Sequence, residues 1–145
     1  QVQQKERWIK AYHITDLFVE SQGVPGKWYE NFSNLEVLGL ANTDRRLSSE
    51  KIEGFMEFSL SEDINVSWSN KTNGYDLTRE LLNIEGFEFY FRLFSIDGIN
   101  FAESGKSPVF YGNLLISGST TAMRRYVSFE ECEKCILEFS LWQWE

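Results

Sequence analysis

The sequence predicts a mainly β, β-rich α+β fold: an antiparallel sandwich or a strongly curved sheet of six or more strands, with two or three short helices. Three observations support this prediction. Aromatic residues, which pack well on pleated sheets, make up 16% of the chain. Residues 86–95 alternate between apolar and polar, and no strand–helix–strand rhythm indicates a parallel sheet. Because composition shows no break over 145 residues, residues 1–145 are expected to form a single domain.

The N-terminal third contains two segments with ambiguous patterns. Residues 8–19 are apolar on both faces, which predicts a central strand, with a helix as the alternative. Residues 33–40 are a weaker candidate for a helix, because Gly39 and β-branched Val37 lower helix propensity.

The middle of the chain is expected to contain a first hairpin, formed by strands at residues 52–58 and 64–69. The first of these segments resembles residues 84–89, thirty-two positions later, and an acidic turn with an Ile-Asn pair follows each copy. Two copies fall short of a repeat array, so a coincidence of strand chemistry is favoured over an old duplication.

A short helix and a second hairpin follow. Residues 76–82 read as a helix with Asp76 as its N-cap. In the strand at 86–95, phenylalanine and leucine side chains occupy one face and polar side chains the other. Residues 96–99 contain Asp-Gly between two isoleucines, which predicts a type I′ turn and a return strand beginning at Ile99.

The C-terminal part is expected to hold two further strands and a helical turn. The strands are predicted at residues 109–117 and 135–144. Between them, Ser128 and Glu131 have the spacing of a capping box, which predicts one or two turns of helix.

Cys132 and Cys135 form a C-x-x-C pattern, the one short motif with a known chemistry. Zinc requires four donors, and beside the single histidine, His13, no second C-x-x-C or paired histidine completes the set, so no metal and no cofactor is expected. The surrounding glutamates disfavour a reactive thiolate. Two structural thiols are the leading interpretation, and a local disulfide is the alternative.

The charge balance narrows the classes of partner. The chain has 14 basic and 22 acidic residues, a net charge of −8, without the basic clusters that nucleic-acid binding requires. No segment approaches the roughly 20 apolar residues of a membrane span, so no membrane insertion is expected. An acidic excess favours a basic protein partner. The compartment is unknown; a soluble protein is expected, with the cytoplasm slightly favoured over secretion because two cysteines make a poor disulfide framework.

These features favour a non-enzymatic binding protein, an acidic contact inhibitor of a basic protein. In composition, though in no motif, the chain resembles small acidic inhibitors such as the immunity proteins that neutralise bacterial toxins. Acidic residues near the C-terminus and aromatic anchors, which are common at interfaces, are the expected contacts. The predicted partner-binding residues are Glu130, Glu131, Glu133, Trp28, Tyr29, Trp142 and Trp144.

Two alternatives remain open. Exposed tryptophan and tyrosine could serve a carbohydrate-binding module, with a glycan as the ligand. A small hydrolase could use two carboxylates, Glu53 with Glu57 or Glu85 with Glu88. A contact inhibitor should show acids and aromatics on one surface, a sugar binder coplanar rings, and an enzyme a concave pocket with close carboxylates.

Overall fold

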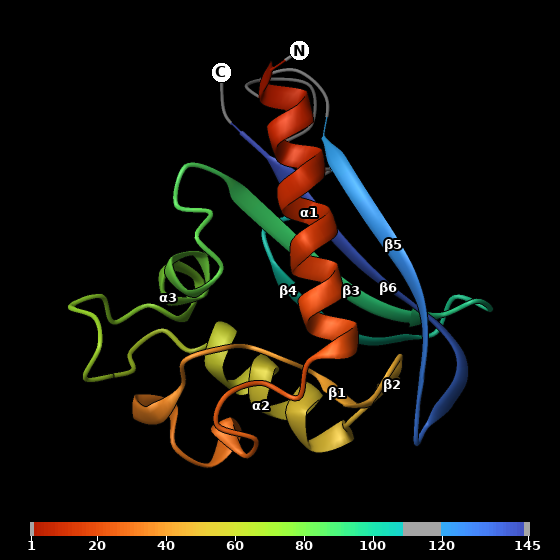
Figure 1. The fold of residues 1–145 in the computed structure, drawn as a ribbon, viewed down its shortest axis with the longest axis horizontal. Helices are drawn as coiled ribbons and strands as arrows, with labels where there is room; N and C mark the ends of the chain where they lie inside the picture. Colours follow the sequence, from red (N-terminus) through yellow and green to blue (C-terminus); the bar gives the residue numbers. More distant parts are fainter. Residues whose placement is uncertain (1, 109–119, 144–145) are drawn as a thin grey trace.

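The computed structural model describes residues 2–108 and 120–143, which fold into a curled mixed sheet with three helices packed against it (Figure 1). This is the predicted β-rich α+β fold, in the form of a strongly curved sheet rather than a sandwich. The helices are α1 (Val2–Glu20), α2 (Ser49–Ser59) and α3 (Gly74–Leu81), with 3-10 turns η1 (Trp28–Glu30) and η2 (Phe32–Asn34). The strands are β1 (Ala41–Thr43), β2 (Arg46–Leu47), β3 (Glu88–Ser95), β4 (Asn100–Gly105), β5 (Thr121–Phe129) and β6 (Cys132–Trp142).

The six strands are ordered β1-β2-β5-β6-β3-β4. All neighbours are antiparallel except β2 and β5, which run parallel and meet where Arg46 lies opposite Ser128. The longest strand, β6, pairs with β3 on one side and β5 on the other, so that Phe139 lies between Phe91 and Met123. The short β1–β2 ribbon forms one edge of the sheet, alongside the C-terminal end of β5.

The core lies between the inner face of the sheet and helices α1 and α2. Phe18 of α1 contacts the rings of Phe55, Phe91 and Phe139, with centroids 5.5 to 5.8 Å apart. All four side chains are fully buried. Figure 1 shows α1 lying across the sheet and α2 near the C-terminal end of α1. Four segments far apart in sequence therefore share one aromatic cluster.

Residues 8–19 belong to α1, so the predicted central strand is wrong and the helical alternative is correct. Ala11, Ile14 and Phe18 recur at helical spacing and face the core. The opposite side nevertheless carries exposed apolar residues, including Ile9 and Tyr12. Because apolar residues occur on every side of the helix, the sequence lacks the apolar repeat of 3.6 residues that an amphipathic helix shows. It has instead the pattern of a strand that is apolar on both faces.

Residues 52–58 belong to α2, not to a strand, and residues 64–69 form no strand. The side chain of Ser48 caps the helix by accepting a hydrogen bond from the Lys51 amide. Gly54 is required where α2 meets η1, because a Cβ there would lie 2.5 Å from the Cβ of Tyr29. Similar sequences at 52–58 and 84–89 thus fold differently, so the likeness does not mark a structural repeat.

The helix predicted at residues 76–82 is confirmed as α3, but a different residue caps it. Asn73, rather than Asp76, accepts hydrogen bonds from the first free amides of α3. Within residues 33–40, only the start of the segment is helical, as part of η2. Gly39 then packs so tightly on the Ser21 carbonyl that a Cβ would lie 2.3 Å from it.

The β3–β4 hairpin is confirmed, but its turn is not type I′. Only Gly98 of this loop has a positive φ, and its amide donates to the Ser95 carbonyl at 2.9 Å. The Ser95 amide in turn bonds the carbonyl of Ile99, which makes a three-residue loop with glycine in the left-handed position. The Ser95 hydroxyl, accepting from the Ile99 amide, stabilises this longer loop.

The predicted strand at 109–117 lies outside the described residues. No described helix has the length and apolar composition needed to cross a membrane.

Candidate interaction surface

The tip of the β5–β6 hairpin carries two of the predicted contact residues. Phe129 lies opposite Cys132, so Glu130 and Glu131 are the two residues of the turn, and both are exposed. The predicted capping box at Ser128 is wrong. The Ser128 amide donates to the Arg45 carbonyl, and the Phe129 ring packs edge-on against the Phe101 ring of β4. These two contacts keep the segment extended.

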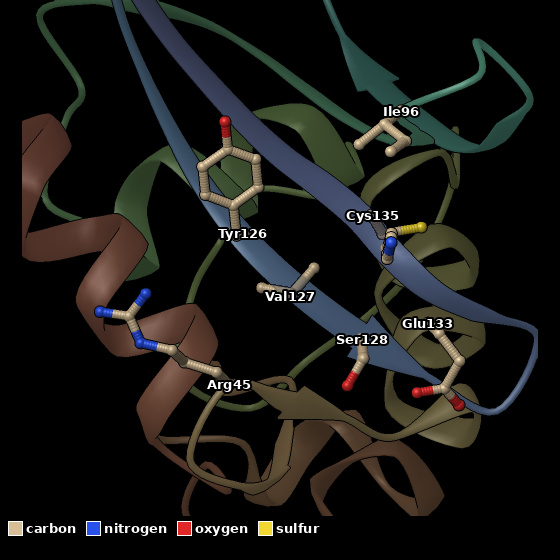
Figure 2. A pocket seen from close by; sticks show the side chains of 8 residues that line it. Arg45, Ile96, Tyr126, Val127, Ser128, Glu133 and Cys135 are labelled. Carbon is tan, nitrogen blue, oxygen red and sulfur yellow. The ribbon is translucent and has the colours of Figure 1, made fainter.

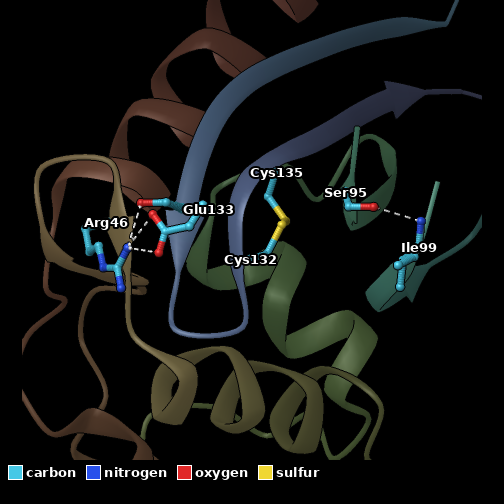
Figure 3. The surroundings of a disulfide bond; sticks show 7 residues. Arg46, Ser95, Ile99, Cys132, Glu133 and Cys135 are labelled. Atoms are coloured by element: carbon cyan, nitrogen blue, oxygen red, sulfur yellow. Dashed lines mark hydrogen bonds and ion pairs between the residues drawn. A yellow bond between two sulfur atoms is a disulfide. The ribbon is translucent and has the colours of Figure 1, made fainter. Parts of the chain in front are cut away.

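A bulge in β6 explains the cysteine pair. Val127 pairs with Cys135 and Phe129 with Cys132, so three steps in β6 match two in β5. The extra residue turns the two cysteine side chains, normally on opposite faces at this spacing, to the same buried side. They form a disulfide (Figure 3) with Cα atoms 6.0 Å apart. The interpretation as two free thiols is therefore replaced by the local disulfide.

Side-chain contacts hold the hairpin tip against β2 and α2. Arg46 pairs with Glu133 at 3.3 Å and donates to the Ser128 hydroxyl at 3.2 Å (Figure 3). Ser49, in the first turn of α2, donates to Glu131 at 3.4 Å. The Arg46–Glu133 pair is largely exposed, so it orients the tip more than it stabilises the fold.

Helix α2 contributes a second set of carboxylates. Glu50, Glu53 and Glu57 follow each other at helical spacing on its solvent face. Tyr29, from η1, donates to Glu50 at 3.4 Å. Desolvation and the neighbouring carboxylates of Glu50 and Glu30 raise the pKa of the Tyr29 phenol. The tyrosine is therefore held as a neutral hydrogen-bond donor at the margin of an acidic region.

We define the acidic surface as the three α2 glutamates and the three hairpin glutamates. These are Glu50, Glu53, Glu57, Glu130, Glu131 and Glu133. A polar hollow of about 510 Å³ joins the two sets, with Glu50 and Glu130 both lining it. Three cations lie close by: Arg46 and Lys51 are engaged, and Lys134, next to Glu133 in β6, is exposed. Arg46 is paired as described, and the buried Lys51 ammonium donates to the Ala41 carbonyl at 3.0 Å. Desolvation lowers the pKa of Lys51.

A second hollow, of about 340 Å³, lies along β5 and β6 (Figure 2). Tyr126 projects beside it and is 72% exposed. Figure 2 shows Arg45 and Glu133 at opposite sides of this hollow, and its lining mixes both charges with apolar side chains. Ser128 and Glu133 already accept hydrogen bonds from Arg46, and Arg45 lies on the other side. These polar groups therefore do not converge on one open point, as those of a small-molecule site do.

The predicted aromatic contacts do not gather on the surface. Trp28 and Trp142 are fully buried, and their indole N–H groups donate to the Gly39 and Lys106 carbonyls, both at 2.9 Å. Neither ring offers surface to a partner. Trp144 lies outside the described residues. Among the predicted aromatics that the structure describes, Tyr29 alone lies at the acidic surface. Reading α2 as a strand concealed Glu50 as a contact residue, since only helical spacing places it with the other α2 acids.

The residues considered for catalysis have other surroundings. Glu53 and Glu57 are solvent-exposed on α2, while Glu88 accepts from Tyr75 at 2.6 Å and Glu85 pairs with a lysine. His13 is exposed on α1 rather than packed in a strand. Within residues 2–108 and 120–143, no group of three or more His, Cys, Asp or Glu is placed to hold a metal ion.

Comparisons with protein-family models, with curated proteins and with solved structures found no match for this chain.

Proposed function

We propose that this protein is a non-enzymatic binding protein that inhibits a basic partner protein by covering it with the acidic surface. One observation carries the proposal: Glu50 of α2 and Glu130 of the β5–β6 tip, about eighty residues apart in the chain, line one polar hollow. Arg46 and Lys51 are engaged by Glu133 and by a backbone carbonyl, and together with exposed Lys134 they stand against six glutamates. The surface therefore keeps a strong excess of negative charge.

Such a surface acts first on the rate of association. Like charges gathered on one side of a protein raise the local concentration of an oppositely charged partner and orient its approach. Arginine-rich partners fit best, because a guanidinium can bind a carboxylate through two parallel hydrogen bonds. Tyr29, beside Glu50, offers a rigid aromatic contact with a polar tip at the edge of the charged region.

The first experiment is affinity capture from the native source with the purified protein as bait, followed by mass spectrometry. Recovery of one basic protein, released at high salt, would supply the partner for kinetic work. If no protein is recovered and a glycan array binds the chain, the carbohydrate-binding alternative replaces this proposal.

Charge reversal then tests the surface itself. In the triple variant Glu130→Lys, Glu131→Lys and Glu133→Lys, association with the captured partner should slow by about tenfold or more at low salt. Surface-plasmon resonance at several salt concentrations measures this effect. The matched control reverses three exposed acids elsewhere, by substituting lysine at Glu20, Glu36 and Asp97. Equal loss in both variants would assign the effect to net charge alone and would contradict a defined contact surface.

A further inference from the structure

Helix α1 carries a narrow solvent-facing stripe that the acidic surface does not use. We define the α1 stripe as Lys5, Ile9, Tyr12 and Asp16, whose spacing of four, three and four residues is that of a coiled-coil seam. At about 100° per residue, these four positions fall within about 60° of one another around the helix. Ile9 and Tyr12 are each 39% exposed. In the view of Figure 1, no other helix or strand lies over α1.

The aromatic member of the stripe is held in place by its neighbours. The ring of Trp8, itself 54% exposed, stacks on Tyr12 with centroids 5.6 Å apart and planes 12° from parallel. The Arg125 guanidinium packs over the same ring at 4.7 Å and pairs with Asp16 at 2.9 Å. An aromatic side chain fixed before binding loses little conformational entropy when a partner arrives, which is a property of interface anchors.

The stripe is complementary to itself. It has the cation Lys5 at one end and two apolar side chains in the middle. At the other end is the anion Asp16, which also pairs with Arg125 of its own chain. When two copies of α1 meet antiparallel about a two-fold axis midway between Ile9 and Tyr12, each Lys5 faces an Asp16 and each Ile9 faces a Tyr12. We propose that this stripe is a homodimer contact, formed by an antiparallel pair of α1 helices from two copies of the chain.

The charge distribution favours a second copy at this place. From residue 5 to residue 20, α1 has three basic and three acidic residues, which gives a formal charge of zero, while the whole chain carries −8. Two copies can therefore approach through α1 without the repulsion that the acidic surface would impose. A single helix pair buries an area at the low end for stable complexes, below about 1,200 Å², so the dimer is expected to be weak and concentration-dependent.

Charge exchange between the two ends of the stripe tests the antiparallel arrangement. Lys5→Glu places two acids opposite each other at both ends, and Asp16→Lys places two lysines there, so each variant alone should dimerise at least tenfold more weakly than the wild type. A mixture of the two variants restores both opposite-charge pairs and should recover the dimer. Sedimentation velocity over a range from about 1 µM to 1 mM measures all four samples.

Two further variants keep the test decisive. Ile9→Asp should weaken the dimer at least as much as Lys5→Glu, and Lys27→Glu, the same charge change on an exposed loop, should leave it unchanged. These variants decide the outcome if circular dichroism shows that Asp16→Lys, which also loses its Arg125 pair, is unfolded. A wild-type protein that stays monomeric throughout this range would overturn the proposal. So would a dimer that Lys5→Glu and Ile9→Asp leave intact.

Discussion

Two tyrosines, Tyr75 and Tyr90, donate their phenol protons to carboxylates on the sheet. Tyr75 in α3 donates to Glu88 at 2.6 Å, accepts from the Phe89 amide at 3.1 Å and stacks on the Phe89 ring. Tyr90 in β3 donates to Glu103 in β4. Burial, followed by the hydrogen bond to the carboxylate, raises the pKa of both phenols far above the ordinary value. Both residues therefore tie neighbouring elements together only in their neutral form.

This arrangement predicts a loss of stability in alkali. A phenol in the unfolded chain ionises near pH 10, while the folded state holds Tyr75 and Tyr90 neutral, so their contribution is complete below about pH 10 and declines as the pH rises above it. In a spectrophotometric titration, these two should ionise only as the fold is lost. Tyr75→Phe should remove one of the delayed phenols. Ionisation of all six tyrosines in one step near pH 10, with unchanged circular dichroism, would contradict the assignment.

At the scale of elements, the junction between α2 and α3 depends on close backbone contact. The Gly74 amide donates to the Ser61 carbonyl at 2.8 Å as α3 begins. A Cβ at Gly74 would lie 2.0 Å from the Phe58 carbonyl oxygen, which belongs to the backbone and cannot rotate away. The glycine is thus required by packing between two helices and not by its own φ angle.

Helix propensity and packing make opposite predictions for Gly74→Ala. Propensity alone favours alanine by up to about 1 kcal/mol in a helix, whereas the clash with backbone should destabilise the protein by about 1–3 kcal/mol. We expect the clash to dominate, as measured by the midpoint of urea unfolding. Gly86→Ala is the matched control, since its Cβ would meet nothing within 4 Å, and it should be neutral or slightly stabilising. Equal effects in the two variants would show that the contact with Phe58 is unimportant.

At the scale of the whole molecule, one aromatic cluster joins helices to sheet. Phe18 contacts rings supplied by α2, β3 and β6 and is fully buried. The same architecture separates two surfaces, with the acidic surface on α2 and the β5–β6 tip and the α1 stripe on the helix that crosses the sheet.

Because Phe18 joins these elements, Phe18→Ala should weaken the entire fold. The expected loss is about 3–5 kcal/mol, a large part of the roughly 5–15 kcal/mol that stabilises a domain. Tryptophan fluorescence and circular dichroism should report the same lowered midpoint in denaturant, because buried Trp28 shares this core. Phe101→Ala, at a phenylalanine that is 37% exposed, should cost much less. A Phe18→Ala protein no less stable than this control would contradict the central role of the cluster.

Residue patterns predict an element correctly where the local chemistry of the segment agrees with its tertiary environment. The period-two alternation of β3 and the Gly98 turn predicted the β3–β4 hairpin, because one face of that strand is buried and the other is not. The helix near residues 76–82 is also confirmed, although Asn73 caps it and the predicted cap Asp76 does not. Glu130 and Glu131, two of the predicted contact residues, are exposed. They lie in a hairpin turn and not in the helical turn that the sequence predicts.

By itself, the sequence determined the β-rich class, the charge excess and the elements whose patterns are local. Only the tertiary structure decided that residues 8–19 and 52–58 are helices. In the first segment, exposed Ile9 and Tyr12 conceal the helical period until one face is buried against the sheet. It also decided that Trp28 belongs to the core and that Glu50 and Glu130 line the same hollow. The physical reason is the same in each case: a local pattern records what a segment can form, while burial and proximity depend on which remote segments pack against it.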